Sequence, residues 1–238
     1  MYNNTMTDVS GSSFANAVML NSNPFINQSY DTTEFDDPVR AYQAPVSHAA
    51  SVEAYKSPGS RRRNIHGFVY DDKVSNRRTA VYHDPRNKRT LLAHRGTQVT
   101  SPRDIATDVA LTFGGFKKTK HYKDQVKKFQ EVYDKYGAKN TYHLTGHSLG
   151  GHLQPLHSRF HKTVKSAVSF NPPGSTSGIV SSGIQRIAMT PAQRAIDKSH
   201  ANFIHSLDPV SILSRHRKNK KGQSKFTLNP HSLDQWAS

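Results

Sequence analysis

One short stretch constrains this chain more than any other. Residues 141–151 read Thr-Tyr-His-Leu-Thr-Gly-His-Ser-Leu-Gly-Gly, so Gly146 and Gly150 flank Ser148 at a distance of two residues. A serine at a sharp turn between a strand and a helix needs such neighbours, because side chains there would collide. The turn lifts the hydroxyl out of the sheet and points the following backbone N–H groups at a developing oxyanion. The spacing predicts Ser148 as a nucleophile.

A serine nucleophile needs a base, and a third group to orient that base. After a turn of this kind both follow downstream, the acid first. Asp208 directly follows the apolar run 202–207, although an Asp-Pro pair also opens ordinary turns. His216 and His231 come later, and His216 lies in Arg-His-Arg-Lys, where neighbouring cations disfavour proton uptake. His231 has apolar neighbours and is the preferred base.

Alternating strand and helix patterns predict an α/β fold. Strand-like runs occupy residues 67–70, 79–82, 90–94, 141–145, 167–170 and 202–207. Apolar residues from Tyr122 to Tyr136 recur every three or four positions, which predicts an amphipathic helix that ends at Gly137. The order favours a mostly parallel sheet flanked by helices and begun by an antiparallel pair.

The first 60 residues differ from the rest. They are rich in Asn, Ser, Thr, Asp and Ala and show no sustained period of 2 or 3.6. Such a segment buries too little apolar surface to offset its ordering entropy. We therefore expect residues 1–60 to form a disordered polar and acidic extension, and residues 61–238 to form one domain, with the border at Arg61, Arg62 and Arg63.

Several motifs, taken in order, resemble the class 3 lipase family, whose fungal members have an α/β-hydrolase fold. Two of these motifs are Leu-Thr-Gly-His-Ser-Leu-Gly-Gly at 144–151 and Ala-His-Arg-Gly-Thr at 93–97. Asp-Pro-Val at 208–210 and His231 before Leu233 complete the set. The resemblance covers roughly residues 67–236 and does not include residues 1–60.

The resemblance implies roles for further residues. The backbone N–H groups of Thr97 and Leu149 would form the oxyanion hole, and Ser148, Asp208 and His231 would form the catalytic triad. Residues 100–109 resemble the segment that forms a short helical lid in fungal members. The substrates would be lipid esters, hydrolysed through an acyl-enzyme, and no cofactor is required.

The chain also departs from the family pattern. Family members usually follow the serine turn with small residues, whereas His152, Leu153, Gln154 and Pro155 stand here. Pro155 removes one helix hydrogen bond and should kink or shorten the helix. Asn-Pro-Pro-Gly at 171–174 replaces a commoner Phe-Gly-x-Pro turn. These changes leave the triad intact and place the shape of the acyl pocket in question.

Charge is the most unusual bulk property, with 33 Lys and Arg against 17 Asp and Glu. Residues 61–238 alone hold 31 basic and 11 acidic residues. Such a domain is drawn to polyanions, although a solvated basic face explains the charge equally well. The basic run 215–225 lacks interleaved aromatic residues for base stacking, which favours an anionic membrane surface over nucleic acid.

Other classes of site receive less support. The chain has no cysteine, which excludes a thiolate nucleophile and Cys-ligated metals. His157 and His161 are four residues apart, a spacing seen in metal sites, but no Glu or third ligand accompanies them, and no metal is expected. No secretory signal or membrane-spanning run is evident, and compartment and oligomeric state stay unassigned.

Two hypotheses follow from the sequence. The first is a serine carboxylic-ester hydrolase acting on lipid esters, of the lipase or phospholipase kind. The second is a non-catalytic binding or structural protein that keeps the hydrolase fold and contacts a polyanion. Covalent labelling of Ser148 by a fluorophosphonate discriminates them, because only an assembled triad reacts.

Overall fold

The computed structural model describes residues 38–96, 119–173, 191, 199–204 and 233. Within them the chain forms one mixed sheet of seven strands, hydrogen-bonded in the order in which they occur along the chain. The strands are β1 (Asn64–Ile65), β2 (Phe68–Tyr70), β3 (Thr79–Asp84), β4 (Arg89–His94), β5 (Thr141–His147), β6 (Val164–Phe170) and β7 (His200–Phe203). Pairs from β1 to β4 are antiparallel, and pairs from β4 to β7 are parallel.

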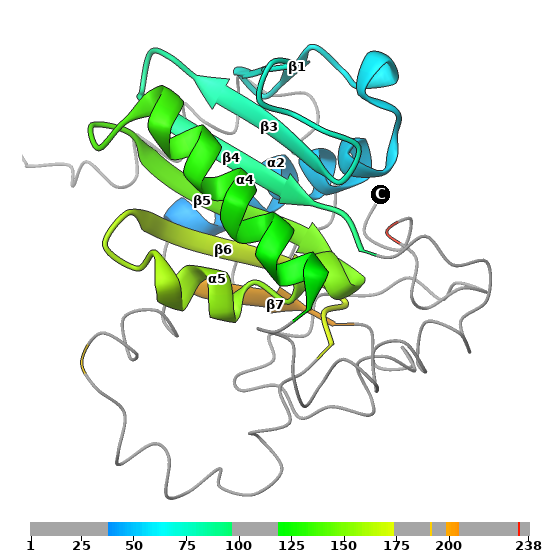
Figure 1. Ribbon diagram of the computed structural model, residues 1–238, viewed down its shortest axis with the longest axis vertical. Coiled ribbons are helices and arrows are strands. Elements are labelled where there is room, and N and C mark those ends of the chain that lie inside the picture. The colour runs from blue at the N-terminus through cyan, green and yellow to red at the C-terminus, as the bar shows by residue number, and fades with distance from the viewer. Residues whose placement is uncertain (1–37, 97–118, 174–190, 192–198, 205–232, 234–238) are drawn as a thin grey trace, which may run out of the picture. The chain divides into compact units, whose positions relative to one another are not determined.

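Helices cover both faces of this sheet (Figure 1). Helix α2 (Pro38–Tyr55) lies on one face, and α4 (Lys120–Tyr136) and α5 (Gln154–Arg159) lie on the other. Two short 3-10 turns, η2 (Pro58–Ser60) and η4 (Ser148–Gly151), follow α2 and β5. The predicted α/β class, a sheet flanked by helices, is confirmed.

Alternation along the central strands explains the layers. In β4, Leu92 faces the apolar cluster under α4 and α5, whereas Leu91 and Ala93 face the cluster under α2. In β3, Val81 and Tyr82 divide between the two faces in the same way. Successive side chains of a strand point to opposite faces, so a sheet buried on both sides needs apolar residues at nearly every position.

Most predicted strands are observed, with shifted ends. The hairpin between β1 and β2 turns at His66 and Gly67, both at positive φ, as a two-residue turn of the primed type requires. β3 runs on to Asp84, and the C-terminal strand, expected at 202–207, begins at His200. Residues 205–207 lie outside the described residues.

The amphipathic helix is confirmed as α4. Thr119 caps its N-terminus by accepting a hydrogen bond from the Tyr122 N–H, 3.2 Å away. Gly137 follows its last turn with φ 73°, and its N–H donates to the Tyr133 carbonyl at 2.7 Å. Phe129 and Val132 are fully buried in the core under this helix.

The expectation of a disordered extension over residues 1–60 is wrong for residues 38–60. Helix α2 buries Ala44, Val46, Ala50 and Ala54 against the sheet. Its buried face consists largely of alanine and serine, which give little hydrophobic signal but let the helix approach the sheet closely. Residues 1–37 lie outside the described residues.

The arginine triplet also belongs to the domain rather than to a border. Arg61 is 4% exposed and donates to the carbonyls of Glu53, Ala54 and Thr79, which joins the end of α2 to β3. The fully buried Glu53 accepts hydrogen bonds from Lys56 at 2.8 Å and from the Arg62 side chain at 2.7 Å. These arginines therefore satisfy the last turn of α2.

Among the described residues, no helix combines the length and the apolar character needed to span a bilayer.

Candidate active site

Ser148 occupies a strained turn at the carboxyl end of the parallel strand β5. Its φ is 54°, a left-handed value that residues with a Cβ rarely adopt. β5 ends at His147, and η4 begins at Ser148, so the predicted strand–turn–helix context is observed. Ser148 itself is 3% exposed.

The two flanking glycines are required by contact. A Cβ added to Gly146 would lie 2.3 Å from the Gly150 carbonyl oxygen. One added to Gly150 would lie 2.3 Å from the His94 carbonyl oxygen, at the end of β4. Backbones that approach this closely leave no room for any side chain. The spacing rationale for Gly-x-Ser-x-Gly is thereby explained.

Gly96 brings a second segment against the turn. A Cβ at Gly96 would lie 3.0 Å from the Ser148 Cβ and 3.1 Å from the Leu149 backbone nitrogen. The chain leaving β4 therefore passes directly over the amide that was expected to donate to the oxyanion. Thr97, the other expected donor, is the next residue and lies outside the described residues.

Tyr55 of α2 joins these two segments. Its hydroxyl accepts a hydrogen bond from the Gly96 N–H at 3.1 Å and lies 2.8 Å from His147 Nδ1. The rings of Tyr55 and His147 meet edge to face at 5.6 Å. Burial raises the pKa of Tyr55 to about 12, so the phenol stays protonated and serves as a donor. His147 therefore packs beside the serine turn.

Sequence reasoning missed Tyr55 because it lies in the segment expected to be disordered. A signal was present in the spacing of Ala44, Ser47, Ser51 and Tyr55, which follow at three, four and four residues and lie on one helical face. Ser51 Oγ lies 3.0 Å from Thr145 Oγ1, which in turn donates to the Val168 carbonyl at 2.9 Å.

The neighbouring strand supports the turn from the other side. Ser169 of β6 is fully buried, and its hydroxyl donates to the Gly151 carbonyl at 2.7 Å. His200 Nε2 of β7 lies 3.0 Å from the hydroxyl oxygen of Ser169. Ser169 of the adjacent strand β6 thus fixes the backbone that follows the serine, and His200 of β7 fixes the Ser169 hydroxyl.

The altered sequence after the turn has the expected effect. η4 ends at Gly151, and α5 begins only at Gln154 and spans six residues, with a proline in its first turn. The interruption is filled by Leu153, which is fully buried. Asn171 adopts φ 44° directly after β6, and its N–H donates to the Phe203 carbonyl at 2.7 Å.

Asp208 and His231, the expected acid and base, lie outside the described residues, as do the proposed lid at 100–109 and the basic run at 215–225. The described residues that are close in sequence to Asp208 and His231 lie at the carboxyl edge of the sheet. β7 ends at Phe203, five residues before Asp208. Leu233, two residues after His231, packs with Phe170 and Phe203, and its carbonyl accepts a hydrogen bond from His48 Nε2 at 3.0 Å.

His157 and His161, whose spacing is seen in metal sites, lie in different environments. His157 is 1% exposed, and burial lowers its pKa to about 4, whereas His161 is exposed and its Nδ1 lies 3.1 Å from the Ser158 carbonyl. No group of three or more His, Asp or Glu residues suited to a metal ion occurs in the described part of the chain.

Comparison with known proteins gives fold-level matches in solved structures. No family model and no curated protein matches the chain. The Lip2 lipase of Yarrowia lipolytica aligns at 16% identity and TM-score 0.41, over 61% of this chain and 62% of that one. A triacylglycerol lipase of Penicillium expansum aligns at 16% and 0.36, over 80% and 78%. A Rhizomucor miehei lipase–propeptide complex aligns at 11% and 0.40, over 73% and 62%. The chain thus spans about three fifths of the first and third of these proteins.

Proposed function

We propose that this protein is a serine carboxylic-ester hydrolase that acts on lipid esters. The observation that carries the proposal is the strained turn itself: Ser148 at φ 54°, between glycines whose backbones are too close for any Cβ. Strain of this kind costs on the order of 1–3 kcal/mol and persists only where the surroundings impose it. It holds the serine at the carboxyl edge of a parallel sheet, where active sites of α/β folds gather.

Leu149 supports an oxyanion hole beside this serine. Its amide follows the nucleophile, the usual place for one donor, and Gly96, the residue before Thr97, approaches the same point. We assign the two donors to the N–H groups of Thr97 and Leu149. Donors held by packing need no reorganisation when charge develops on the substrate oxygen.

We assign the acid to Asp208 and the base to His231. Parallel strands β5, β6 and β7 all end at one edge, so β7, the last described strand before Asp208, ends at the same edge of the sheet as the Ser148 turn. Leu233, two residues after His231 in the sequence, packs against Phe170 and Phe203 at that edge. This supports His231 over His216.

The chemistry follows from these roles. His231 takes the proton from Ser148 Oγ as the oxygen attacks the ester carbonyl, and the protonated imidazole then gives that proton to the leaving alcohol. Asp208 orients His231 and stabilises its imidazolium form. Water, activated by the same imidazole, hydrolyses the acyl-enzyme, which releases the acid and regenerates the serine. The lipid-ester class rests on the motif resemblance.

Labelling with a fluorophosphonate, followed by peptide mass spectrometry, tests the proposal. The protein should be labelled at Ser148 and should hydrolyse a short p-nitrophenyl ester. Ser148→Ala and His231→Ala should each lose at least a thousandfold in kcat, while His216→Ala retains most of it. An unlabelled but folded protein would favour the rival, a polyanion-binding protein that the strong basic excess also suits. A dead His216→Ala with an active His231→Ala would reverse the assignment of the base.

A further inference from the structure

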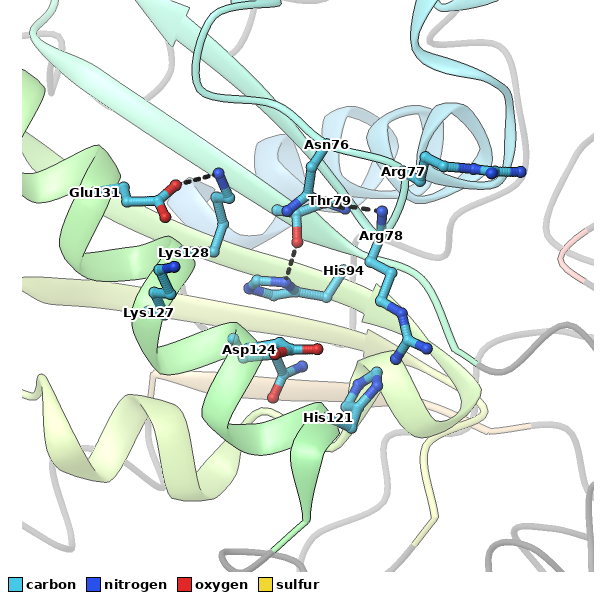
Figure 2. Close-up of a pocket in the computed structure, with 11 residues that line it drawn as sticks. Asn76, Arg77, Arg78, Thr79, His94, His121, Asp124, Lys127, Lys128 and Glu131 are labelled. Atoms are coloured by element: carbon cyan, nitrogen blue, oxygen red, sulfur yellow. Dashed lines mark hydrogen bonds and ion pairs between the residues drawn. The ribbon is translucent and has the colours of Figure 1, made fainter.

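A separate pocket lies between the β2–β3 connection, the end of β4 and helix α4 (Figure 2). Its cavity volume is about 390 Å³, within the range of small-molecule sites. The residues of its wall are Asn76, Arg77, Arg78, Thr79, His94, His121, Asp124, Gln125, Lys127, Lys128 and Glu131. None of them has a role in the proposed ester hydrolysis.

The inner wall of this pocket holds polar atoms without partners. His94 is 1% exposed, and its Nε2 has no hydrogen-bond partner. Gln125 is 3% exposed, and its Oε1 also has none. Buried polar atoms without partners are costly and each needs an explanation. Both residues line the cavity, and a ligand that reached these two atoms would give them partners.

The hydrogen bond to Thr79 favours a proton on the other ring nitrogen of His94, Nε2. Nδ1 lies 2.9 Å from Thr79 Oγ1, a buried hydroxyl whose proton has no other acceptor within the described residues. When the Thr79 hydroxyl donates its proton to Nδ1, the neutral His94 ring carries its own proton on Nε2. Burial, with smaller contributions from the charges of His121 and Lys128, lowers the pKa of His94 to about 3. The ring is therefore neutral at ordinary pH, and it forms part of the cavity wall.

The charges around the cavity favour an anion. Figure 2 shows Arg78 and His121 close together at one end and the Lys128–Glu131 ion pair at the other, with the His94 ring between them. No acidic partner is found for Arg78 or Lys127 in the described part of the chain. Asp124 is paired with Lys120, whose side chain lies outside the cavity. Arg78 and Lys127 therefore give the cavity that His94 and Gln125 line a positive charge without an acidic partner among the described residues.

We infer that this pocket binds a phosphate group, as free phosphate or as a small phosphate monoester. Phosphate oxygens would accept from His94 Nε2, Arg78 and Lys128. The singly protonated form would also donate its P–OH to Gln125 Oε1, which a carboxylate cannot do. The cavity exceeds what a bare phosphate fills and leaves room for a short organic group. The inference does not depend on the proposed hydrolase activity.

Calorimetric titration of the full chain with inorganic phosphate and with glycerol 3-phosphate tests this site, against chloride at equal ionic strength. Saturable binding of at least one phosphate probe is expected, with a change in the His94 imidazole NMR signal. Arg78→Gln should weaken binding at least tenfold, because an exposed cation that contacts the anion is removed. Lys123→Gln is the matched control: an exposed lysine of α4 outside the cavity with the same change in charge.

A variant of opposite sign keeps the test independent of folding. Glu131→Gln frees Lys128 from its ion pair and should tighten phosphate binding severalfold. If the parent protein binds glycerol 3-phosphate more tightly than inorganic phosphate, the site is assigned to monoesters. If it binds inorganic phosphate more tightly, the site is assigned to the free ion. No saturable binding of either probe would overturn the inference. Equal losses in Arg78→Gln and Lys123→Gln would overturn it as well, because general charge would then explain the binding.

Discussion

At Ser148 the backbone accepts a left-handed conformation because Gly146 and Gly150 let three backbone segments meet. The carbonyl of His94, at the end of β4, touches the space that a Cβ at either glycine would occupy. The geometry of the turn is therefore a property of two adjacent strands, and a substitution at either glycine must displace a neighbouring strand end.

Gly150→Ala should abolish labelling of Ser148 and lower the free energy of unfolding by about 3 kcal/mol, because a Cβ 2.3 Å from a backbone oxygen forces the backbone to move. Gly59→Ala is the matched control, since nothing lies within 4 Å of its added Cβ. Its unfolding free energy should stay within about 0.5 kcal/mol of the parent. Urea unfolding measures both, and an active, stable Gly150→Ala protein would contradict the packing described.

Glu53 makes the stability of the domain depend on pH. Burial alone raises the pKa of this carboxyl, but hydrogen bonds from Lys56 and Arg62 outweigh it and hold the pKa below its usual value. A carboxyl with a lowered folded-state pKa stabilises the fold above its unfolded pKa, near 4.3, and that stability is lost as the pH falls through the lower folded value.

Glu53→Gln should therefore lower the free energy of unfolding by about 2 kcal/mol at pH 7, because charge-assisted hydrogen bonds are lost while Lys56 and Arg62 remain partly hydrated. The difference from the parent should shrink as the pH drops below about 4. Thermal unfolding at a series of pH values measures it. A difference that grows toward acid pH would contradict the direction of the pKa shift.

At the scale of elements, α2 connects the N-terminal part of the chain to the serine turn. The helix contributes apolar surface, the buried Glu53 network and the Tyr55 hydroxyl. A helix of this composition has little stability alone, so α2 needs the sheet to stay folded. The serine turn in turn depends on the Tyr55 hydroxyl of α2.

Deleting residues 1–37 should leave the described contacts of the sheet in place and preserve cooperative thermal unfolding. Deleting residues 1–60 removes α2 and should abolish that cooperativity, because Ala50, Ala54 and the strand residues they cover would be exposed to water. Circular dichroism melts of the two truncated proteins compare them directly. Equal melting curves would show that α2 is dispensable.

Tyr55→Phe should slow fluorophosphonate labelling of Ser148 about tenfold, because the Gly96 amide and His147 lose the hydroxyl that holds them together. The cost in stability should be about 1 kcal/mol. Tyr82→Phe is the control, since its buried hydroxyl donates to the Arg62 carbonyl, away from the turn. It should lose similar stability while its labelling rate stays near that of the parent. Equal slowing in both variants would indicate a general structural effect.

At the scale of the whole molecule, the basic excess bears on where the protein acts. Charges on an exposed surface are screened beyond about 8–10 Å at physiological salt, so distant lysines have little effect on the chemical step. They raise the concentration of the protein at an anionic surface, by very roughly 1 kcal/mol per residue near it.

Replacing Lys218, Lys220 and Lys221 together by Gln should weaken binding to phosphatidylserine vesicles and slow hydrolysis of esters embedded in them, more so at low salt. Turnover of a soluble short ester should hardly change. Replacing Lys73, Lys123 and Lys139, exposed lysines elsewhere, gives the control with an equal change in charge. Sedimentation with vesicles measures binding, and equal loss in both triple variants would rule out a specific role for the run 215–225.

The sequence by itself determined the serine turn, helix α4 and most of the strands. These features depend on local constraints, namely glycine spacing, apolar periodicity and capping residues, which act over a few neighbours along the chain. The candidate nucleophile and the Leu149 amide belong to this class. The expected roles of Thr97, Asp208 and His231 come from order along the chain and remain predictions.

Tertiary structure alone decided the place of α2, the role of Tyr55 and the phosphate pocket. The buried face of α2 consists largely of alanine and serine, and in the sequence alone their low hydrophobicity resembles that of an unstructured segment. Only the folded sheet brings Ser51 into contact with Thr145, 94 residues further along the chain. The pocket likewise gathers Arg78, His94 and Gln125 from separate elements. Contacts between residues far apart in sequence leave no local pattern, because their energy depends on a partner that only folding brings near.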